Sequence, residues 1–288
     1  MTDISHFGPT CILGEGPLWH PLRQQLFWFD IPAGILYCTN EHGGQRRSWN
    51  FGEAASAAGW VDQSALIVAT ASGLQKLDID TGTWETLAPL EADNDATRSN
   101  DGRIGPDGSF WIGTMGYNLE PAAGAYYRYK NGTLNRLFDR ITVPNATCFS
   151  PDGRTAYLSD TRKQYVWRWT LDGNGDPVGE KEIHLNLREE GLNPDGAVCD
   201  AEGYLWNAQW GASRIARYAP DGSCDRVIEL PVSQPTCPCF GGPDLKTLYI
   251  TSARENLDTG TLEKEPQAGT VLSMTVDVPG FHEFQAKL

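Results

Sequence analysis

The chain repeats one local pattern six times, a tight turn followed by a short apolar strand. The copies are PLRQQLFWF (21–29), DQSALIVA (62–69), PDGSFWIG (106–113), PDGRTAYL (151–158), AEGYLWNA (201–208) and PDLKTLYI (243–250). Equivalent turn positions lie 41 to 50 residues apart, a spacing that accommodates about four short antiparallel strands per unit. The repeat therefore predicts an all-β fold, a six-bladed β-propeller with four-stranded antiparallel blades.

Composition agrees with an all-β chain. Ten Trp, ten Tyr and ten Phe among 288 residues favour strands, and no stretch shows helical periodicity over a useful length. Composition does not shift anywhere along the chain, so we expect residues 1–288 to form one propeller domain. The first residues are expected to help close the ring.

Charge and targeting signals narrow the classes of partner. With 23 basic and 37 acidic residues, the net charge is −14, which disfavours nucleic acid and anionic membranes and is most simply explained by solubility. The N-terminal residues lack the features of a signal peptide, and no apolar run approaches the roughly 18 residues of a membrane span. Seven scattered cysteines indicate a reduced, cytoplasmic protein without a disulfide framework. We expect a monomer or a weak homo-oligomer.

Polar residues recur at one position of the repeat, seven residues before the turn. They are Glu15, Ser56, Asn100, Asn145, Asp195 and Cys237. In a propeller the innermost strand of each blade begins at one rim of the central channel, so these side chains are expected to face one another. Arg98, two residues before Asn100, is expected on the loop above the channel mouth.

Two interpretations of this ring remain open. Asn and Asp are common loop formers before strands, and this explains any one of the positions taken alone. Two carboxylates and two amides at a single position favour a cation site instead, because carboxylates forced together repel unless a cation lies between them. Oxygen ligands without His or Cys suit Ca²⁺ or Mg²⁺, although Zn²⁺, Mn²⁺ and Fe²⁺ also accept carboxylates. Few protein ligands would leave positions for water and substrate.

Long motifs give the chain a specific resemblance. They include LGEGPLWHP (13–21), RSNDGRIGPDGSFWIGTMG (98–116), PNATCFSPDGRTAYLSDT (144–161) and NPDGAVCDAEGYLWNAQWG (193–211). In this order they resemble the gluconolactonase/regucalcin (senescence marker protein) family of sugar lactonases, whose fold is a six-bladed β-propeller. The resemblance covers nearly the whole chain.

The resemblance implies a set of site residues. Glu15, Asn145 and Asp195 match the family's ligands for one divalent metal ion, with Ca²⁺ the expected ion. Asp195 also matches the proposed general base, and Arg98 and Asn100 match substrate-contacting residues. The expected activity is hydrolysis of an aldonolactone or aldarolactone to the open sugar acid, with the metal polarising the lactone carbonyl.

Two positions depart from the family pattern. Asn145 is followed by Ala146 where relatives often have Gly, a change that should leave the Asn side chain undisturbed. Where some relatives place an acidic substrate contact, this chain has Asn118, with Glu120 two residues further on. We expect Asn118 to contact substrate, but Glu120 is an alternative, and the preferred sugar stays open.

Other functions have weaker support. The chain has no GxSxG elbow of an α/β serine hydrolase. Cys237 is expected to be a packed thiol, because no clear base accompanies it. A calcium-binding regulatory protein without turnover remains an alternative that leaves Arg98 without a role. A propeller that serves as an interaction platform is another, although the polar ring faces inward.

Overall fold

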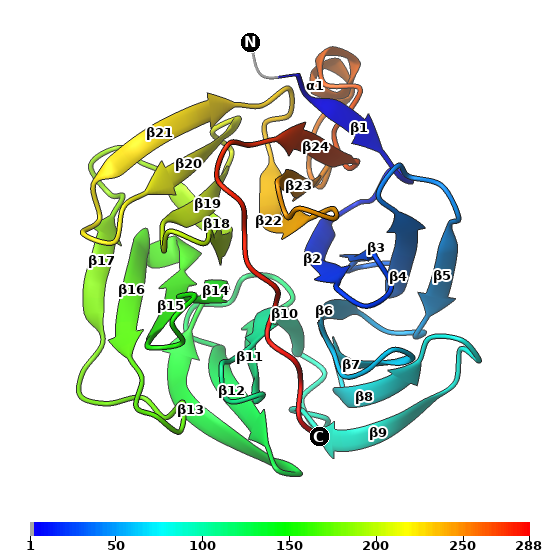
Figure 1. Ribbon diagram of the computed structural model, residues 1–288, viewed down its shortest axis with the longest axis vertical. Coiled ribbons are helices and arrows are strands. Elements are labelled where there is room, and N and C mark those ends of the chain that lie inside the picture. Colours follow the sequence, from blue (N-terminus) through cyan, green and yellow to red (C-terminus); the bar gives the residue numbers. More distant parts are fainter. Residues whose placement is uncertain (1–2) are drawn as a thin grey trace.

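The computed structural model describes residues 3–288, and its strands form six four-stranded antiparallel sheets arranged in a ring (Figure 1). The predicted six-bladed propeller is therefore confirmed. In the first five blades the strands follow chain order from the central channel outward. The innermost strands of successive blades contact one another around the channel.

The blades divide the chain evenly. Blade 1 contains β2 (Gly14–His20), β3 (Gln25–Asp30), β4 (Ile35–Asn40) and β5 (Arg47–Asn50); blade 2 contains β6 (Ala55–Trp60), β7 (Ala65–Thr70), β8 (Gly73–Asp78) and β9 (Trp84–Pro89); blade 3 contains β10 (Thr97–Ile104), β11 (Phe110–Gly116), β12 (Gly124–Lys130) and β13 (Thr133–Ile141). Blade 4 contains β14 (Pro144–Phe149), β15 (Thr155–Asp160), β16 (Tyr165–Thr170) and β17 (Glu182–Asn186); blade 5 contains β18 (Asn193–Cys199), β19 (Leu205–Trp210), β20 (Arg214–Tyr218) and β21 (Cys224–Glu229); blade 6 contains β22 (Pro235–Gly241), β23 (Thr247–Ser252), β24 (Val271–Thr275) and β1 (Ser5–Phe7).

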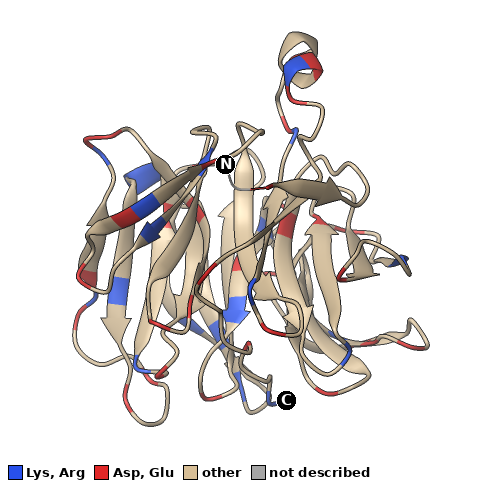
Figure 2. Cartoon of the chain, turned by 45° about the horizontal axis from the view of Figure 1, so that its top comes forward, with Lys and Arg blue, Asp and Glu red and all other residues tan. Residues whose placement is uncertain are grey.

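Among the described residues, helix is confined to two short elements, the 3₁₀ turn Thr161–Lys163 and α1 (Thr259–Lys264). Figure 2 shows α1 standing clear of the blades, and it buries no residue. Among residues 3–288, neither element is long and apolar enough to cross a membrane. In the same view, acidic and basic residues are interspersed over the loops and outer strands.

The core lies between the faces of adjacent blades. Every residue of β7 and β11 is buried, because a middle strand is covered by a neighbouring blade on both faces. The outermost strand β9 is exposed over most of its length. This burial explains why the second strand of each unit reads as an almost uninterrupted apolar run.

The turns that mark the repeat are stabilised by their own side chains. In blade 4 the Asp152 carboxylate accepts hydrogen bonds from the Ser150 hydroxyl (2.6 Å) and the Arg154 backbone N–H (3.0 Å). Gly153 has a φ of +70°, which a residue without Cβ adopts at little cost. The Asp-Gly signal therefore identifies a real tight turn.

The N-terminal strand closes the ring, as expected. β1 forms the outer edge of blade 6 by pairing with β24, and Phe7 lies opposite Val271. The Phe7 ring meets Trp28 of blade 1 and Tyr249 of blade 6 edge-on, with centroids 6.3 Å and 5.9 Å apart. One side chain thus joins the first and last blades.

The C-terminal segment, residues 276–288, crosses the centre of the ring (Figure 1). Its backbone is hydrogen-bonded to the turns and strand ends on the rim opposite the start of the inner strands. The bonds link Pro279 to Ala201, Gly280 to Leu245, Ala286 to Trp60 and Lys287 to Gly108. The segment therefore covers the opening of the channel opposite the polar ring, and its backbone is hydrogen-bonded to four blades.

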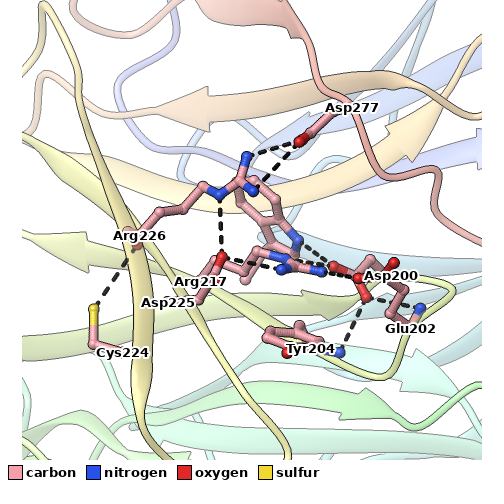
Figure 3. A network of polar contacts seen from close by, with 9 residues as sticks. Asp200, Glu202, Tyr204, Arg217, Cys224, Asp225, Arg226 and Asp277 are labelled. Atoms are coloured by element: carbon pink, nitrogen blue, oxygen red, sulfur yellow. Dashed lines mark hydrogen bonds and ion pairs between the residues drawn. The ribbon is translucent and has the colours of Figure 1, made fainter.

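A network of ion pairs fastens the start of this segment to blade 5 (Figure 3). Arg217 is almost fully buried and contacts Asp200 (2.8 Å), Glu202 (2.8 Å) and Asp225 (3.0 Å). Asp225 also contacts Arg226, which holds Asp277 at 2.8 Å. The outer exposed pairs contribute little individually, whereas the buried Arg217 depends on its carboxylate partners.

The ring closure gives a test of the fold. Phe7→Ala removes the contact between blades 1 and 6 and should lower the free energy of unfolding by about 2 kcal/mol. Urea denaturation monitored by tryptophan fluorescence measures the change. Ser5→Ala, at an exposed position on the same strand, is the control and should have little effect. Equal stability of the two variants would contradict a stabilising role of Phe7 between blades 1 and 6.

Candidate functional site

Every inner strand has an irregularity in its pairing with the second strand, at the same place near its start. The breaks lie between Glu15 and Leu18, Ala55 and Ala57, Ser99 and Gly102, Asn145 and Cys148, Pro194 and Ala197, and Pro235 and Pro238. Bulges of this kind re-aim side chains and are frequent beside active sites. All six residues of the predicted ring lie at or within these bulges.

The bulges also correct the predicted alignment. Glu15 and Asn145 are the last paired residues before a bulge, Asn100 and Asp195 are the first residues inside one, and Cys237 is the second. The ring therefore occupies adjacent positions rather than one equivalent position. Counting residues back from the turn cannot detect this shift. An unpaired residue changes which residues of the two strands lie opposite one another, but the number of residues between the ring position and the turn stays the same.

Gly16 allows the first bulge to form. Its φ is +55°, and a Cβ at this position would lie 2.2 Å from the Ser56 backbone oxygen of the next blade. Its N–H donates to the Glu15 carboxylate at 2.9 Å. Ala146, at the corresponding place in blade 4, also has a positive φ of 54°. Ala146 therefore adopts the backbone conformation that Gly16 has in blade 1, at a cost of about 1 kcal/mol.

A chain of hydrogen bonds orients the two amides. Arg98 Nη1 donates to Asn100 Oδ1 at 2.7 Å, and Asn100 Nδ2 donates to the Pro144 carbonyl (2.9 Å) and to Asn145 Oδ1 (3.3 Å). Asn145 Nδ2 in turn donates to the Thr161 hydroxyl at 2.9 Å. The structure thus brings Arg98, Asn100 and Asn145 together, with the Asn145 oxygen directed toward the channel residues of blade 3.

Glu15 and Asp195 are buried carboxylates that lie near each other. Burial raises the pKa of Glu15 to about 8, and the nearby Asp101 carboxylate adds to the rise. Burial, followed by the charges of Glu15 and Asp101, raises the pKa of Asp195 well above its ordinary value. The Asp195 carboxylate has no hydrogen bond to another side chain among residues 3–288. Negative charge gathered in this way is unfavourable unless a cation compensates it.

The donor chemistry fits a hard divalent cation. No three His, Cys, Asp or Glu side chains of residues 3–288 are grouped to hold a metal ion, so the candidate set is two carboxylates, Glu15 and Asp195, and the Asn145 amide. Carboxylate and amide oxygens are ligands that Ca²⁺ accepts in flexible geometry. Three protein ligands leave coordination positions for water or substrate.

Arg98 lies in the inner strand β10, paired with Met115, so its predicted place on the loop above is wrong. β10 pairs with β11 at Thr97, Arg98 and Ser99, before the bulge, so the strand begins before Arg98. Burial lowers the pKa of Arg98, while the nearby Glu255, Tyr117 and Glu15 raise it. Arg98 is half-buried.

Asn118 lies on the loop after β11, and its expected contact with substrate stays a prediction. It is exposed there, and its Nδ2 donates to Glu120 at 2.9 Å and its backbone N–H donates to the same carboxylate. Asn118 and Glu120 are therefore partners of one another. Tyr117, whose side chain is 48% exposed, is the residue of this loop that interacts with Arg98.

Sequence reasoning missed Tyr117, Glu255 and Asp101. Asp101 directly follows Asn100, and the bulge gives both residues access to the channel. A search for bulges could have found it, whereas Glu255 comes from a loop without a motif. Cys237 is a packed thiol, as expected: it is buried, and burial raises its pKa well above the ordinary value, so it is poorly suited to act as a nucleophile.

Comparison with known proteins gives consistent matches. A family model described as SMP-30/Gluconolactonase/LRE-like region matches residues 13–254. The chain is 37% identical to the 6-deoxy-6-sulfogluconolactonase of Pseudomonas putida over 94% of each chain. It is 33% identical to the L-arabinolactonase of Azospirillum brasilense over 90% of this chain and 87% of that one. The crystal structure of a calcium-binding protein, regucalcin, from Agrobacterium tumefaciens is similar, with a TM-score of 0.95 and 38% identity over 97% of this chain and 95% of that chain.

Gly16 allows a test of the bulge. Gly16→Ala should lower the free energy of unfolding by about 1 kcal/mol for the positive φ and by a further 1–3 kcal/mol or so for the contact with Ser56. Gly52→Ala is the matched control, because Gly52 also has a positive φ (+77°) but a Cβ added there would have nothing within 4 Å. Urea denaturation measures both, and equal losses would contradict the proposed close contact.

The raised pKa of Glu15 predicts a dependence on pH. Without a cation the folded protein holds a proton from the ordinary pKa of 4.5 up to about 8, which the unfolded chain releases. The free energy of unfolding should therefore fall as pH rises through this range. Ca²⁺ should remove most of this fall by stabilising the ionised carboxylates. Thermal melts from pH 5 to 8.5, in EDTA and in Ca²⁺, check the prediction; identical slopes would contradict it.

Proposed function

Since the chain belongs to the SMP-30/gluconolactonase/LRE-like family, we propose that it hydrolyses a sugar lactone to the open-chain sugar acid with a divalent cation in the channel mouth. The observation that carries the proposal is that two buried carboxylates, Glu15 and Asp195, lie near each other, and that Thr161 links the Asn145 amide to the carbonyl of Pro194, the residue before Asp195. The names of two similar proteins, a sulfogluconolactonase and an arabinolactonase, indicate the substrate class.

Glu15, Asn145 and Asp195 would hold the cation. Ca²⁺ is the expected ion, because the donors are oxygens and a similar solved structure is described as a calcium-binding protein. When bound, such an ion supplies Lewis acidity, which polarises a carbonyl oxygen and lowers the pKa of a water molecule. Arg98 is linked to Asn145 through Asn100, so it would lie next to a substrate bound at the cation.

Asp195 serves as the general base. Its carboxylate takes a proton from the water that attacks the lactone carbonyl carbon, and the tetrahedral intermediate then loses the ring oxygen as the leaving group. The same proton returns to that oxygen, so the products are a free hydroxyl and a carboxylic acid, which ionises. Burial favours this role, because it prevents the carboxylate from being fully solvated.

Arg98 and Asn100 orient the substrate. Arg98 Nη1 donates to the Ser99 carbonyl (2.9 Å) and to Asn100 Oδ1 (2.7 Å), which fixes the plane of the guanidinium. Its remaining N–H groups are available for substrate hydroxyls or for the new carboxylate of the product. Tyr117 and Glu255 are the nearest rim residues that could distinguish one sugar from another.

A calcium-binding role without turnover is the second candidate. The same three oxygen ligands would bind the ion, and regucalcin is described as a calcium-binding protein. This role needs neither a base nor Arg98. An assay for lactone hydrolysis therefore separates the two candidates.

The assay follows acid release from a panel of aldonolactones and aldarolactones. Asp195→Asn should lower kcat by about 10²–10⁴-fold, because it removes the general base and a metal ligand. Arg98→Ala should mainly raise KM, by about tenfold, because Arg98 holds the substrate equally in the ground state and the transition state. Asp152→Asn, in a surface turn on blade 4, is the control and should retain full activity.

Chelation tests the need for the cation. Exhaustive treatment with EDTA should abolish turnover, and added Ca²⁺ or another divalent ion should restore it. Full activity after chelation, or in Asp195→Asn, would overturn the proposed mechanism. Ca²⁺ binding without hydrolysis of any lactone would favour the regulatory alternative.

A further inference from the structure

Arg103 lies at the centre of the channel, below the candidate metal ligands. Its guanidinium donates to the Thr147 carbonyl (3.1 Å) on β14, the Ala197 carbonyl (3.1 Å) on β18 and the Cys237 sulfur (3.8 Å) on β22. The remaining nitrogen pairs with Glu283 of the C-terminal segment. One buried cation thus connects the inner strands of four blades, including its own, with the segment that covers the channel.

Glu283 reaches Arg103 because the C-terminal segment is held on both sides of it. The Glu283 carbonyl accepts a hydrogen bond from Trp60 Nε1 at 2.8 Å, and Phe284 packs into the cores of blades 2, 3 and 4. The carboxylate is only 10% exposed. A cavity of the channel lies between Glu283, Arg103, Asp101 and Gly16, so the segment and the bulges share one enclosed space.

The charged groups around the channel include more carboxylates than guanidinium groups. Arg103 pairs with Glu283, and Glu255 is the first charged neighbour of Arg98. Burial and, after it, neighbouring carboxylates that include Asp101 raise the pKa of Glu15 and Asp195. Without Glu283, Arg103 would offset one of these three negative charges and weaken their attraction for a divalent cation.

We propose that Glu283 is a positioning residue for the metal site, which it favours from the far end of the channel by neutralising Arg103. The inference rests on the proposed function, since it concerns the cation that Glu15, Asn145 and Asp195 would hold. Arg103 and Asp101 grip the same residue, through the Thr147 carbonyl and the Thr147 N–H (2.6 Å) respectively. Because Glu283 neutralises Arg103, the Asp101 carboxylate can accept from the Thr147 N–H without also pairing with Arg103.

The test is calorimetric titration of Ca²⁺, Mg²⁺, Mn²⁺ and Zn²⁺ into the chelator-treated full chain, with thermal melts of each variant. Glu283→Gln should raise the Kd of the ion that binds the wild type by about tenfold or more, since a buried charge acts over many ångströms. Asp277→Asn is the matched control: it removes an exposed ion pair of the same segment and should change Kd by less than about twofold. Glu283→Asp, which keeps the charge, should stay near the wild-type Kd.

A second pair of variants removes the structural role of the ion pair. Arg103→Met/Glu283→Gln and Arg103→Lys/Glu283→Gln both lack the pair, and only the second keeps the positive charge that Glu283 neutralises. We expect the variant with Lys to bind the cation about tenfold or more weakly than the variant with Met. This comparison decides the question if Glu283→Gln alone does not fold.

The outcomes are distinguishable. An unchanged Kd in Glu283→Gln with a lower melting temperature, or equal Kd values in the two Arg103 variants, would reduce Glu283 to a clamp and overturn the inference while leaving the proposed function intact. A wild-type protein that binds none of the four ions would overturn both the metal-dependent mechanism and the inference.

Discussion

The channel depends on two hydrogen bonds that Asp101 and Arg103 of blade 3 make with the backbone of Thr147 in blade 4. Inner strands of neighbouring blades belong to different sheets, so they cannot satisfy one another's backbone groups with a regular ladder. Polar groups that face the channel must instead be paired by side chains, because a buried unpaired N–H or carbonyl is costly. Asp101 accepts from the Thr147 N–H and Arg103 donates to its carbonyl, and each brings a charge into the interior.

These charges explain why a functional site can form in the same place. Arg103 forms an ion pair with Glu283, and its positive charge lowers the pKa of Asp101 and Glu15, against the larger effect of burial. Burial raises the pKa of Glu15 and Asp195, and neighbouring carboxylates add to the rise, which a bound cation would reverse. The arrangement that ties the blades together thus also produces an oxygen-rich site at one end of the channel.

Much of the fold can be predicted because it rests on local signals. Turn residues such as Asp152 and Gly153 act within a few residues, and the repeat spacing predicts the six units, the four strands per blade and the closing role of the first residues, which Phe7 fulfils. The ring of polar residues is predictable for the same reason. The bulges are not, because an extra unpaired residue such as Asp101 leaves no mark on spacing, and the loop predicted for Arg98 is in fact strand.

Contacts between distant segments cannot be predicted in this way. Glu283 pairs with a residue 180 positions earlier, and no motif surrounds it in a sequence rich in isolated acidic residues. The Asn118–Glu120 pair depends on loop conformation, and only the structure shows that these side chains bind each other. Asn145 is recognisable because the resemblance and the repeat point to it independently.

The central claim is that Glu15, Asn145 and Asp195 together bind a divalent cation. Anomalous diffraction from crystals of the chelator-treated protein soaked in Mn²⁺ tests it most directly. The account predicts one strong anomalous peak with an oxygen of each of the three side chains at about 2.2 Å. A peak away from these residues, or a channel mouth without any peak at saturating Mn²⁺, would contradict it.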